Sequence, residues 1–294
     1  MTQLQGIVMQ QNGGFYYVEA ADVVYTCRAR GAFRRQGMAP VAGDRVVISV
    51  NEDLTGVLEQ VLERRNCLVR PPVANVDLLV LVASVCQPKT NTLVLDKMIA
   101  VAEKQNICPI VVINKSDLGD PGELESIYHT TGLECFTVSA TDPQSLAPLR
   151  QRLAGQISVF AGNSGVGKSS ILNGLDPTLQ LSTGEISQKL GRGRHTTRTA
   201  TLYHLADGFL VDTPGFSSLD LEQVEPIYKE ELADCFREFA DYIDECRFTG
   251  CAHYKEPGCG VRRAVDEGKI ARSRYDSYVT MYEAVKDIKE WEKV

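Results

Sequence analysis

The order of two short motifs constrains the fold of this chain more than any other feature of its sequence. Gly162–Ser169 reads Gly-Asn-Ser-Gly-Val-Gly-Lys-Ser and matches the pattern of a phosphate-binding loop. Asn114–Asp117 reads Asn-Lys-Ser-Asp, the pattern of a guanine-reading loop, which follows the phosphate loop in domains of the usual topology. In this chain the guanine-reading motif comes first. The inverted order predicts a circularly permuted domain that binds a guanine nucleotide.

The phosphate-binding pattern has the context that its chemistry requires. It follows a predicted strand, Ile157–Ala161, and opens a predicted helix, Ser169–Leu175. Backbone N–H groups of such a loop converge on phosphate oxygens. We expect Lys168 to neutralise the β- and γ-phosphates and the Ser169 hydroxyl to bind Mg²⁺. The predicted nucleotide contacts come from the whole loop: Gly162, Asn163, Ser164, Gly165, Val166, Gly167, Lys168, Ser169 and Ser170.

The guanine-reading motif ends a predicted buried strand, 109–113. The Asp117 carboxylate can accept hydrogen bonds from guanine N1–H and N2–H, whereas adenine would leave it unpaired, and sites built on such bonds discriminate strongly. The stem of Lys115 can lie over the base, and Asn114 can brace the loop. Ser139 and Ala140, at the end of another predicted strand, would offer backbone N–H groups to guanine O6.

A third loop follows the predicted strand that ends at Val211 and reads Asp-Thr-Pro-Gly. Asp212 would hold Mg²⁺ through water, and the Gly215 amide would meet the γ-phosphate. The preceding segment 191–198 is rich in glycine and positive charge, as a mobile loop is. One of its threonines can bind Mg²⁺ when GTP is present, and we favour Thr197 over Thr196. The alternative interpretations are an ordinary turn and an ordinary surface loop.

Hydrolysis requires a group that orients the attacking water. Many GTPases place a Gln directly after the Asp-x-x-Gly motif, but Phe216 occupies that position here. His195 is the nearest candidate in sequence and is therefore our predicted catalytic residue, together with Lys168 and Thr197. The alternative is a solvated loop histidine. We expect slow intrinsic hydrolysis that a partner accelerates by ordering the loop.

Cysteine and histidine residues cluster near the C-terminus, at positions Cys246, Cys251, His253 and Cys259. Three thiolates and one imidazole form a closed tetrahedral set, which predicts one structural Zn²⁺ rather than a catalytic one. The alternative is reduced cysteines in a turn. The remaining cysteines are expected to be reduced, mostly buried thiols: Cys27, Cys67, Cys86, Cys108, Cys135 and Cys235.

The pattern of predicted strands and helices divides the chain into three predicted domains. Residues 1–70 contain five short strands separated by turns, which favours an OB-fold barrel that binds RNA. Residues 73–220 alternate strands and helices, which predicts a mostly parallel sheet with ligands at its carboxyl edge. Residues 221–294 are helical and polar around the zinc cluster. Pro71-Pro72 marks the first boundary as a stiff linker.

The net charge of −7 argues against a simple basic nucleic-acid binder, but Leu221–Glu245 alone holds nine acidic and two basic residues. Local basic clusters could contact RNA or be solvated surface: Arg28, Arg30, Arg34 and Arg35; Lys189, Arg192, Arg194 and Arg198; Arg262, Arg263, Lys269, Arg272 and Arg274. Tyr16 or Tyr17 could stack on bases. The sequence shows no secretory signal and no apolar run long enough for a bilayer, so we expect a cytoplasmic protein without a membrane partner.

Taken together, these motifs resemble the ribosome small-subunit-dependent GTPase A (RsgA) family over essentially the whole chain. The resemblance implies an OB-fold, a circularly permuted GTPase and a zinc-binding domain. It also implies a GTPase that acts late in maturation of the 30S subunit, is stimulated by that subunit, and has 16S rRNA, GTP and GDP as partners. In the family the histidine before Thr-Thr positions water, which matches His195. We expect a monomer.

The permuted order has a mechanical consequence. The Asp212 loop runs directly into the zinc domain, so we expect the nucleotide to set the orientation of that domain. Two other functions stay open. One is a nucleic-acid-binding module whose nucleotide site is a switch without turnover, which the absent Gln favours. The other is a zinc-dependent hydrolase, against which the closed ligand set argues.

Overall fold

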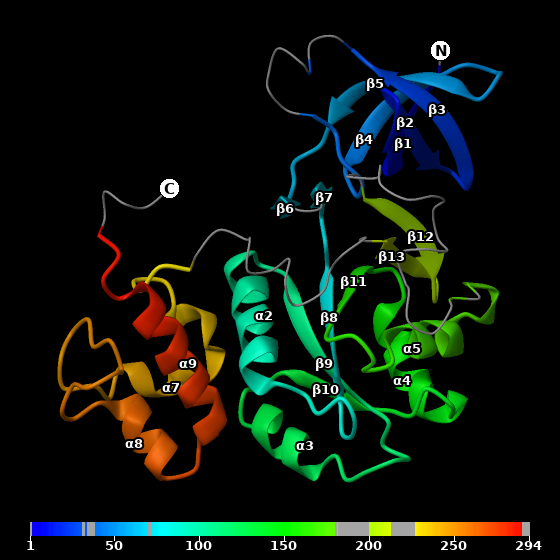
Figure 1. The fold of residues 1–294 in the computed structure, drawn as a ribbon. Coiled ribbons are helices and arrows are strands. Elements are labelled where there is room, and N and C mark those ends of the chain that lie inside the picture. Colours follow the sequence, from blue (N-terminus) through cyan, green and yellow to red (C-terminus); the bar gives the residue numbers. More distant parts are fainter. Residues whose placement is uncertain are drawn as a thin grey trace.

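The computed structural model describes residues 2–30, 33, 39–69, 72–179, 181, 200–212 and 227–289. It has three packed parts: an N-terminal barrel, a central α/β sheet, and a C-terminal helical region that lies beside the sheet (Figure 1). Among these residues no helix is long and apolar enough to span a bilayer. The three parts agree with the fold predicted from the sequence.

Five strands form the barrel, in the order β1-β2-β3-β5-β4 with β4 pairing back to β1. Neighbouring strands pair antiparallel except β3 and β5, which pair parallel. The strands are β1 (Thr2–Asn12), β2 (Phe15–Ala20), β3 (Val23–Ala29), β4 (Arg45–Val50) and β5 (Thr55–Val61). Alternate side chains such as Val8, Val18 and Leu58 fill the interior and are fully buried. Tyr16 belongs to this core and is 7% exposed, so the expectation that it could stack on a base is wrong.

The linker after the barrel is a small hairpin and not merely a proline-stiffened segment. Strands β6 (Cys67–Val69) and β7 (Pro72–Ala74) pair antiparallel. Arg64 grips the buried Asp44 carboxylate with two hydrogen bonds of 2.7 Å, one to each oxygen. Arg65 pairs with Asp77 at 2.6 Å. These ion pairs fix the barrel against the start of the central sheet.

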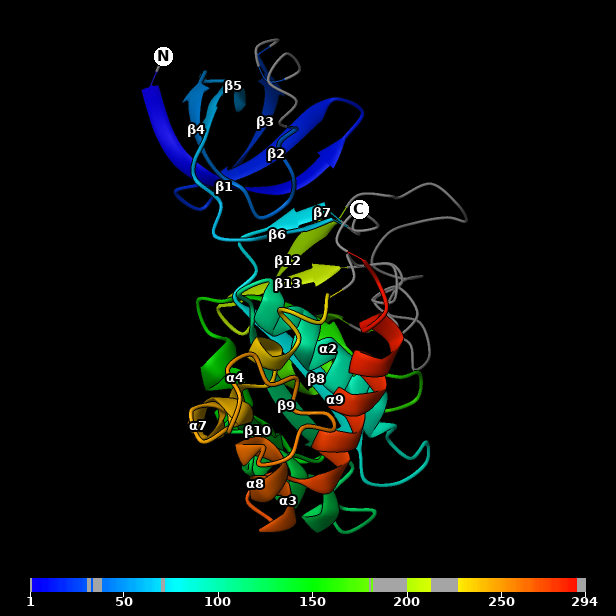
Figure 2. The ribbon, with the colours of Figure 1, turned by 90° about the vertical axis from the view of Figure 1, so that its left-hand side faces the viewer.

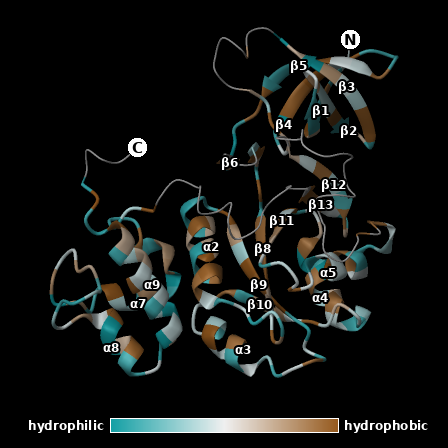
Figure 3. Ribbon diagram, in the orientation of Figure 1, coloured by the Kyte–Doolittle hydropathy of each residue, from teal (hydrophilic) through white to brown (hydrophobic). Residues whose placement is uncertain are grey.

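The central sheet is parallel except for one strand. Its order is β10-β9-β8-β11-β13-β12, and only β12 runs antiparallel. Its strands are β8 (Leu78–Ser84), β9 (Cys108–Asn114), β10 (Glu134–Thr137), β11 (Ile157–Ala161), β12 (Thr201–Leu205) and β13 (Gly208–Asp212). All seven residues of β8 are buried, because helices cover both faces. Figure 3 shows brown, hydrophobic colouring along β8 and β9.

Helices α2 (Thr92–Lys104) and α3 (Gly122–His129) pack on one face of the sheet through side chains such as Met98 and Leu124. Helices α4 (Pro143–Leu153) and α5 (Lys168–Leu175) pack on the other through Leu149 and Ile171. A short 3₁₀ helix, η1 (Pro177–Leu179), follows α5. This arrangement of strands and helices confirms the predicted α/β domain.

The sheet does not stop at β12. Gln10 of β1 pairs with Thr201 of β12, so the central sheet and the barrel share one eleven-stranded sheet. His204 of β12 adds a 2.8 Å contact to the Glu19 carboxylate on β2. The hairpin β12–β13 connects the two loops predicted to sense the γ-phosphate. The barrel is therefore bonded to the element between those loops.

The C-terminal region consists of η3 (Ala233–Cys235), η4 (Arg237–Phe239), α7 (Ala240–Ile243), α8 (Gly260–Asp266) and α9 (Arg272–Val285). Its core contains Phe236, Phe239 and Tyr278, with ring centroids 4.9 to 5.3 Å apart. Helix α9 packs against α2, and both views place the two helices side by side (Figure 2). The core of this region also includes Ala100 of α2 and the buried Cys259 of the Cys/His cluster.

Two further expectations from the sequence are corrected by burial. Arg274 falls in a cluster of basic residues expected at the surface, but it is fully buried between Asp96 of α2 at 2.8 Å and Glu238 of η4 at 2.7 Å. The six scattered cysteines are free thiols, but only Cys27 and Cys235 are buried and the other four are half-buried.

Candidate functional site

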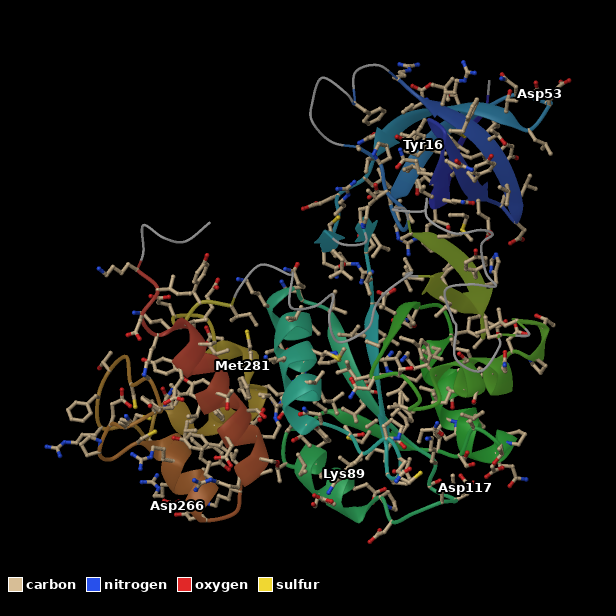
Figure 4. All side chains as sticks on the ribbon, in the orientation of Figure 1. Tyr16, Asp53, Lys89, Asp117, Asp266 and Met281 are labelled. Carbon is tan, nitrogen blue, oxygen red and sulfur yellow. The ribbon has the colours of Figure 1, made fainter. Side chains whose placement is uncertain are left out.

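The carboxyl ends of β8, β9, β10 and β11 lie at one edge of the sheet, where doubly wound folds bind ligands. The loops that leave these ends carry the predicted guanine and phosphate motifs. Figure 4 shows Asp117 and Lys89 at this end of the molecule. The fold thus places the guanine-reading and phosphate-binding motifs at the same edge of the sheet, although their order along the chain is inverted.

The phosphate loop follows β11 and needs its glycines. Gly162, Gly165 and Gly167 have φ angles of 137°, 82° and 100°. A Cβ on Gly162 would lie 2.4 Å from the Val82 carbonyl oxygen. The Lys168 ammonium donates to the carbonyls of Gly162 at 2.6 Å and Asn163 at 2.9 Å, and burial lowers the pKa of Lys168. The loop is held in a tight curve with its cation inside.

Asn114, the last residue of β9, connects three loops. Its side-chain amide donates to the Val166 carbonyl of the phosphate loop at 2.9 Å, and its side-chain oxygen accepts from the Ala140 N–H at 3.2 Å. The side chain is 1% exposed. A Cβ at Gly167 would lie 2.2 Å from the Asn114 amide nitrogen, so only glycine leaves room for this contact.

The rest of the guanine motif turns sharply away from β9. Lys115 has a φ of 65°, and its ammonium donates to the Gln87 carbonyl at 2.6 Å. Asp117 is exposed to solvent. The sequence analysis missed the segment after β8, which contributes Gln87 and Pro88 to the site. A Cβ on Gly165 would lie 3.3 Å from the Cδ atom of the Pro88 ring. The only signal of this segment was its position at a strand end.

The backbone donors expected to meet guanine O6 already have partners. The Ser139 N–H donates to the Ser145 hydroxyl at 3.0 Å, and the Ala140 N–H donates to Asn114. The Ser145 hydroxyl also contacts the carbonyls of Ser139 at 3.0 Å and Asp142 at 2.8 Å. A guanine O6 would therefore share one of these donors. Ser145 was also missed, because a serine in the first turn of a helix carries no distinctive pattern.

Three predicted residues, His195, Thr197 and Gly215, lie outside the described residues. Asp212 is the last residue of β13, and its backbone pairs with that of Thr201. Ser169 lies in the first turn of α5 and is 8% exposed, and Ser170 follows it. Asn163 and Ser164 lie in the loop itself.

The Cys/His cluster assembles as predicted. Its four ligand atoms lie within 4.8 Å of one another. The Nδ1 atom of His253 is 3.5 Å from the sulfurs of Cys246 and of Cys259, which are 4.0 Å apart. A tetrahedral zinc ion with ordinary bond lengths sets sulfur and nitrogen ligands about 3.5 Å apart and two sulfurs about 3.8 Å apart. The cluster could therefore hold a metal ion.

Each cysteine sulfur of the cluster accepts one hydrogen bond from a backbone N–H. The N–H of His253 donates to Cys251 at 3.4 Å, that of Gly260 to Cys246 at 3.3 Å, and that of Arg262 to Cys259 at 3.5 Å. Such donors stabilise thiolates around a metal. Burial raises the pKa of the Cys251 and Cys259 thiols and lowers that of His253. The imidazole is therefore neutral and ready to bind a metal, whereas the thiols must lose protons.

Family comparisons agree with this geometry. The RsgA GTPase family model matches residues 61–222, and the RsgA N-terminal domain model matches residues 5–58. The chain is 43% identical to the small ribosomal subunit biogenesis GTPase RsgA of Caldanaerobacter subterraneus subsp. tengcongensis, over 100% of this chain and 98% of the relative. It is 42% identical to the protein of the same name in Bacillus subtilis, over 97% and 98% of the two chains.

Two solved structures are similar over nearly the whole chain. YjeQ from Thermotoga maritima superposes with a TM-score of 0.85 at 39% identity and covers 98% of this chain and 100% of its own. YloQ, described as a circularly permuted GTPase, superposes with a TM-score of 0.82 at 36% identity, covering 98% and 96%. The inverted motif order and the strand order described above are those of a circularly permuted GTPase.

Proposed function

The chain belongs to the RsgA GTPase family and is a GTP hydrolase, and we propose that the small ribosomal subunit stimulates its hydrolysis of GTP during late maturation of that subunit. The proposal takes its partner from the relatives, which are named as small ribosomal subunit biogenesis GTPases. The observation that carries the nucleotide site is the Asn114 side chain, which links the guanine loop, the Ala140 loop and the phosphate loop.

In this proposal guanine lies between the stem of Lys115 and the Ala140 loop, with N1–H and N2–H donating to the exposed Asp117 carboxylate. The Gln87 carbonyl holds the Lys115 ammonium at 2.6 Å and so keeps its stem in place. The phosphates lie against the N–H groups at the start of α5, where the helix dipole favours negative charge. Lys168 then exchanges its loop carbonyl contacts for phosphate oxygens.

Hydrolysis transfers the γ-phosphoryl group of GTP to water and gives GDP and phosphate. Mg²⁺, bound by Ser169 and Thr197 and held by Asp212 through water, would neutralise charge on the phosphates. His195 orients the attacking water, and the Gly215 N–H meets the γ-phosphate. Because Phe216 cannot orient water, turnover depends on a partner that places the loop of His195.

Zn²⁺ is the metal that we assign to Cys246, Cys251, His253 and Cys259, because thiolate and imidazole ligands in a closed tetrahedron suit it. Four protein ligands leave no open position, so the ion is structural. One ion per chain would staple the small core around Phe239, whose ring packs edge-on against His253 at 5.9 Å.

The proposal keeps the three-domain division at residues 1–70, 73–220 and 221–294. The barrel would contact 16S rRNA through exposed cations such as Arg28. Arg30 is less suited, since it pairs with Glu59 at 2.7 Å. We place the chain in the cytoplasm as a monomer with GTP, GDP and the 30S subunit as its partners.

The test is a GTPase assay with and without small ribosomal subunits, repeated for His195→Ala. We expect stimulation of the unaltered chain and its loss in the variant, while GDP binding is kept. His129→Ala is the matched control, because His129 is exposed on α3 outside the site. Absence of turnover in the presence of subunits would favour a binding module whose nucleotide site is a switch without catalysis.

A further inference from the structure

The backbone at His253 has a conformation that residues with a side chain seldom adopt. Its φ angle is 54°, in the left-handed region, and the residue is only 2% exposed. The Cβ atom makes this region unfavourable, so a residue stays there only where the surrounding contacts hold it. In this conformation the Nδ1 atom of His253 lies 3.5 Å from the sulfurs of Cys246 and Cys259. The ligand geometry of the Cys/His cluster therefore depends on the contacts that hold this part of the backbone.

One carboxylate holds the N–H groups on both sides of His253. The Glu256 carboxylate accepts three hydrogen bonds from backbone N–H groups: Tyr254 at 3.0 Å, Lys255 at 3.0 Å and Ala252 at 3.2 Å. Burial alone would raise the pKa of Glu256, but backbone donors outweigh it and lower the pKa. The carboxylate is therefore ionised at neutral pH and acts only as an acceptor. It fixes the residues that precede and follow the histidine.

Helix α9 holds the carbonyl groups of the same loop. The Tyr278 hydroxyl donates to the Ala252 carbonyl at 2.6 Å, and the Tyr275 hydroxyl donates to the His253 carbonyl at 2.9 Å. Both tyrosines are buried. Irregular backbone that is buried needs partners for its N–H and its carbonyl groups alike. The loop is thus held between Glu256 on its N–H side and α9 on its carbonyl side.

The cysteine ligands are held by other contacts. The sulfurs of Cys246 and Cys259 accept hydrogen bonds from the backbone N–H groups of α8, at Gly260 and Arg262. The four atoms that gather within 4.8 Å are three sulfurs and one nitrogen of His253, and they include no atom of Glu256. Any effect of the Glu256 carboxylate on the metal site would therefore pass through His253.

We propose that Glu256 is a positioning residue of the metal site, because its carboxylate keeps His253 in the left-handed conformation that turns Nδ1 toward the sulfurs. Without these hydrogen bonds the loop relaxes toward more favourable backbone conformations, and the imidazole no longer faces the other ligands. Residues that orient metal ligands in this way change metal affinity by about 10- to 100-fold. The inference rests on the proposed function, which assigns Zn²⁺ to this cluster.

Glu256→Gln tests the role of the carboxylate. The variant keeps the size of the side chain but replaces one acceptor oxygen with an NH₂ group, which only donates. Competition with a chromophoric chelator at one pH measures the zinc affinity of the full chain. We expect an affinity about 10- to 100-fold lower than that of the unaltered chain. An unchanged affinity would overturn the proposal.

Glu283→Gln is the matched control for charge. Glu283 is exposed on α9 and accepts a hydrogen bond from the Tyr254 hydroxyl, so it touches the side chain of the same loop and not its backbone. Both variants remove one negative charge near the metal. Glu283→Gln should lower zinc affinity by under about 2-fold, as surface substitutions do. Equal losses in the two variants would assign the effect to charge and would overturn the positioning role.

A double-mutant cycle tests whether Glu256 acts through His253. In His253→Ala the three cysteines remain, but no imidazole is left for Glu256 to position. Adding Glu256→Gln to that variant should then lower zinc affinity by under about 3-fold, against about 10- to 100-fold when His253 is present. Equal losses in both backgrounds would show that Glu256 acts on the cysteines or on the fold, and would overturn the proposal.

Amide hydrogen exchange of the zinc-loaded chains needs no histidine variant, and it decides the matter if His253→Ala does not fold. In Glu256→Gln the amides of residues 252, 254 and 255 should exchange at least about 10-fold faster, while those of Gly260 and Arg262 keep their rates. Equal acceleration in both segments would mean general loosening and would overturn the proposal. Failure of the unaltered chain to bind zinc would refute the zinc assignment and this inference with it. Zinc binding that Glu256→Gln keeps in full would refute this inference alone.

Discussion

The side-chain amide of Asn114 donates a 2.9 Å hydrogen bond to the carbonyl of Val166, which lies 52 positions further along the chain. The same side chain accepts from Ala140. These two bonds join the guanine-reading loop to the phosphate loop and to the Ala140 loop, although the permutation reverses the order of the first two along the chain. The strength of this connection can be measured.

Asn114→Ala should weaken binding of GDP and GTP alike by about 10- to 100-fold, because it leaves a buried carbonyl and a half-buried N–H without partners, at about 1–3 kcal/mol. Calorimetric titration with each nucleotide measures the effect. Asn66→Ala is the control, since Asn66 makes the same pair of bonds to Val76, at 2.8 and 2.9 Å, far from the site. Equal nucleotide affinity for both variants would contradict the bridging role.

Asp117→Asn should exchange guanine for xanthine. The carboxylamide can no longer accept both guanine N–H groups, but it can donate to the C2 carbonyl of xanthine. Loss of two charge-assisted hydrogen bonds predicts GTP affinity about 100- to 10,000-fold lower, with XTP bound more tightly than GTP. Competition against a fluorescent nucleotide measures both. Asp120→Asn, which changes a carboxylate three residues on, should keep the preference for GTP.

Much of this site could be predicted because each motif has a chemical reason at a fixed spacing. The glycines, Lys168 and Asn114 lie where strand–loop–helix logic places them. Gln87 could not be found, because it contributes a backbone carbonyl that any residue would offer. The Ser139 N–H donates to the Ser145 hydroxyl, which therefore competes with a guanine oxygen for this donor. A sequence motif does not show such a local contact.

Long-range contacts were the other part that escaped prediction. Arg274 stands in a basic segment, and nothing local says that it is buried, since its partner Asp96 is 178 positions away. The pairing of Gln10 with Thr201 joins strands from opposite parts of the chain in the same way. Tyr16 and Tyr17 are neighbours of equal chemistry, and only the strand register decides that Tyr16 faces the core.

Metal affinity should rise with pH. Burial raises the pKa of the Cys251 and Cys259 thiols, so both are protonated at neutral pH, whereas the lowered pKa of His253 leaves it neutral. Zinc binds thiolates, and binding therefore releases these protons. Between about pH 6 and pH 8 we expect affinity to increase with pH, with at least two protons released, about one from each of these two thiols.

Competition with a chromophoric chelator at several pH values measures this dependence, and calorimetry in buffers of different ionisation enthalpy counts the protons. Cys259→Ala should lose the ion, and with it the fold of the C-terminal region. Cys235→Ala is the control, because Cys235 is a buried cysteine of the same core that is not a ligand. An affinity independent of pH would show that the thiols do not bind the metal.

Arg274→Met should be severely destabilising. It would leave the carboxylates of Asp96 and Glu238 buried, at 0% and 6% exposure, without the cation that lies between them. These carboxylates together raise the pKa of Arg274 above its usual range, against the effect of burial, so the guanidinium is charged. Breaking a buried ion pair from one side costs about 3–5 kcal/mol.

Urea denaturation measures the loss of stability, and Arg272→Met, two residues earlier and exposed, should cost under about 1 kcal/mol. The triple variant Asp96→Asn/Glu238→Gln/Arg274→Met should recover part of the stability, because no unpaired charge is left.

The same network bears on the expectation that the nucleotide reorients the zinc domain. Reorientation would break the Arg274–Asp96 pair. We therefore expect the distance between spectroscopic labels on α2 and α9 to be the same with bound GDP and with a bound non-hydrolysable GTP analogue. A change of this distance would show that the network opens.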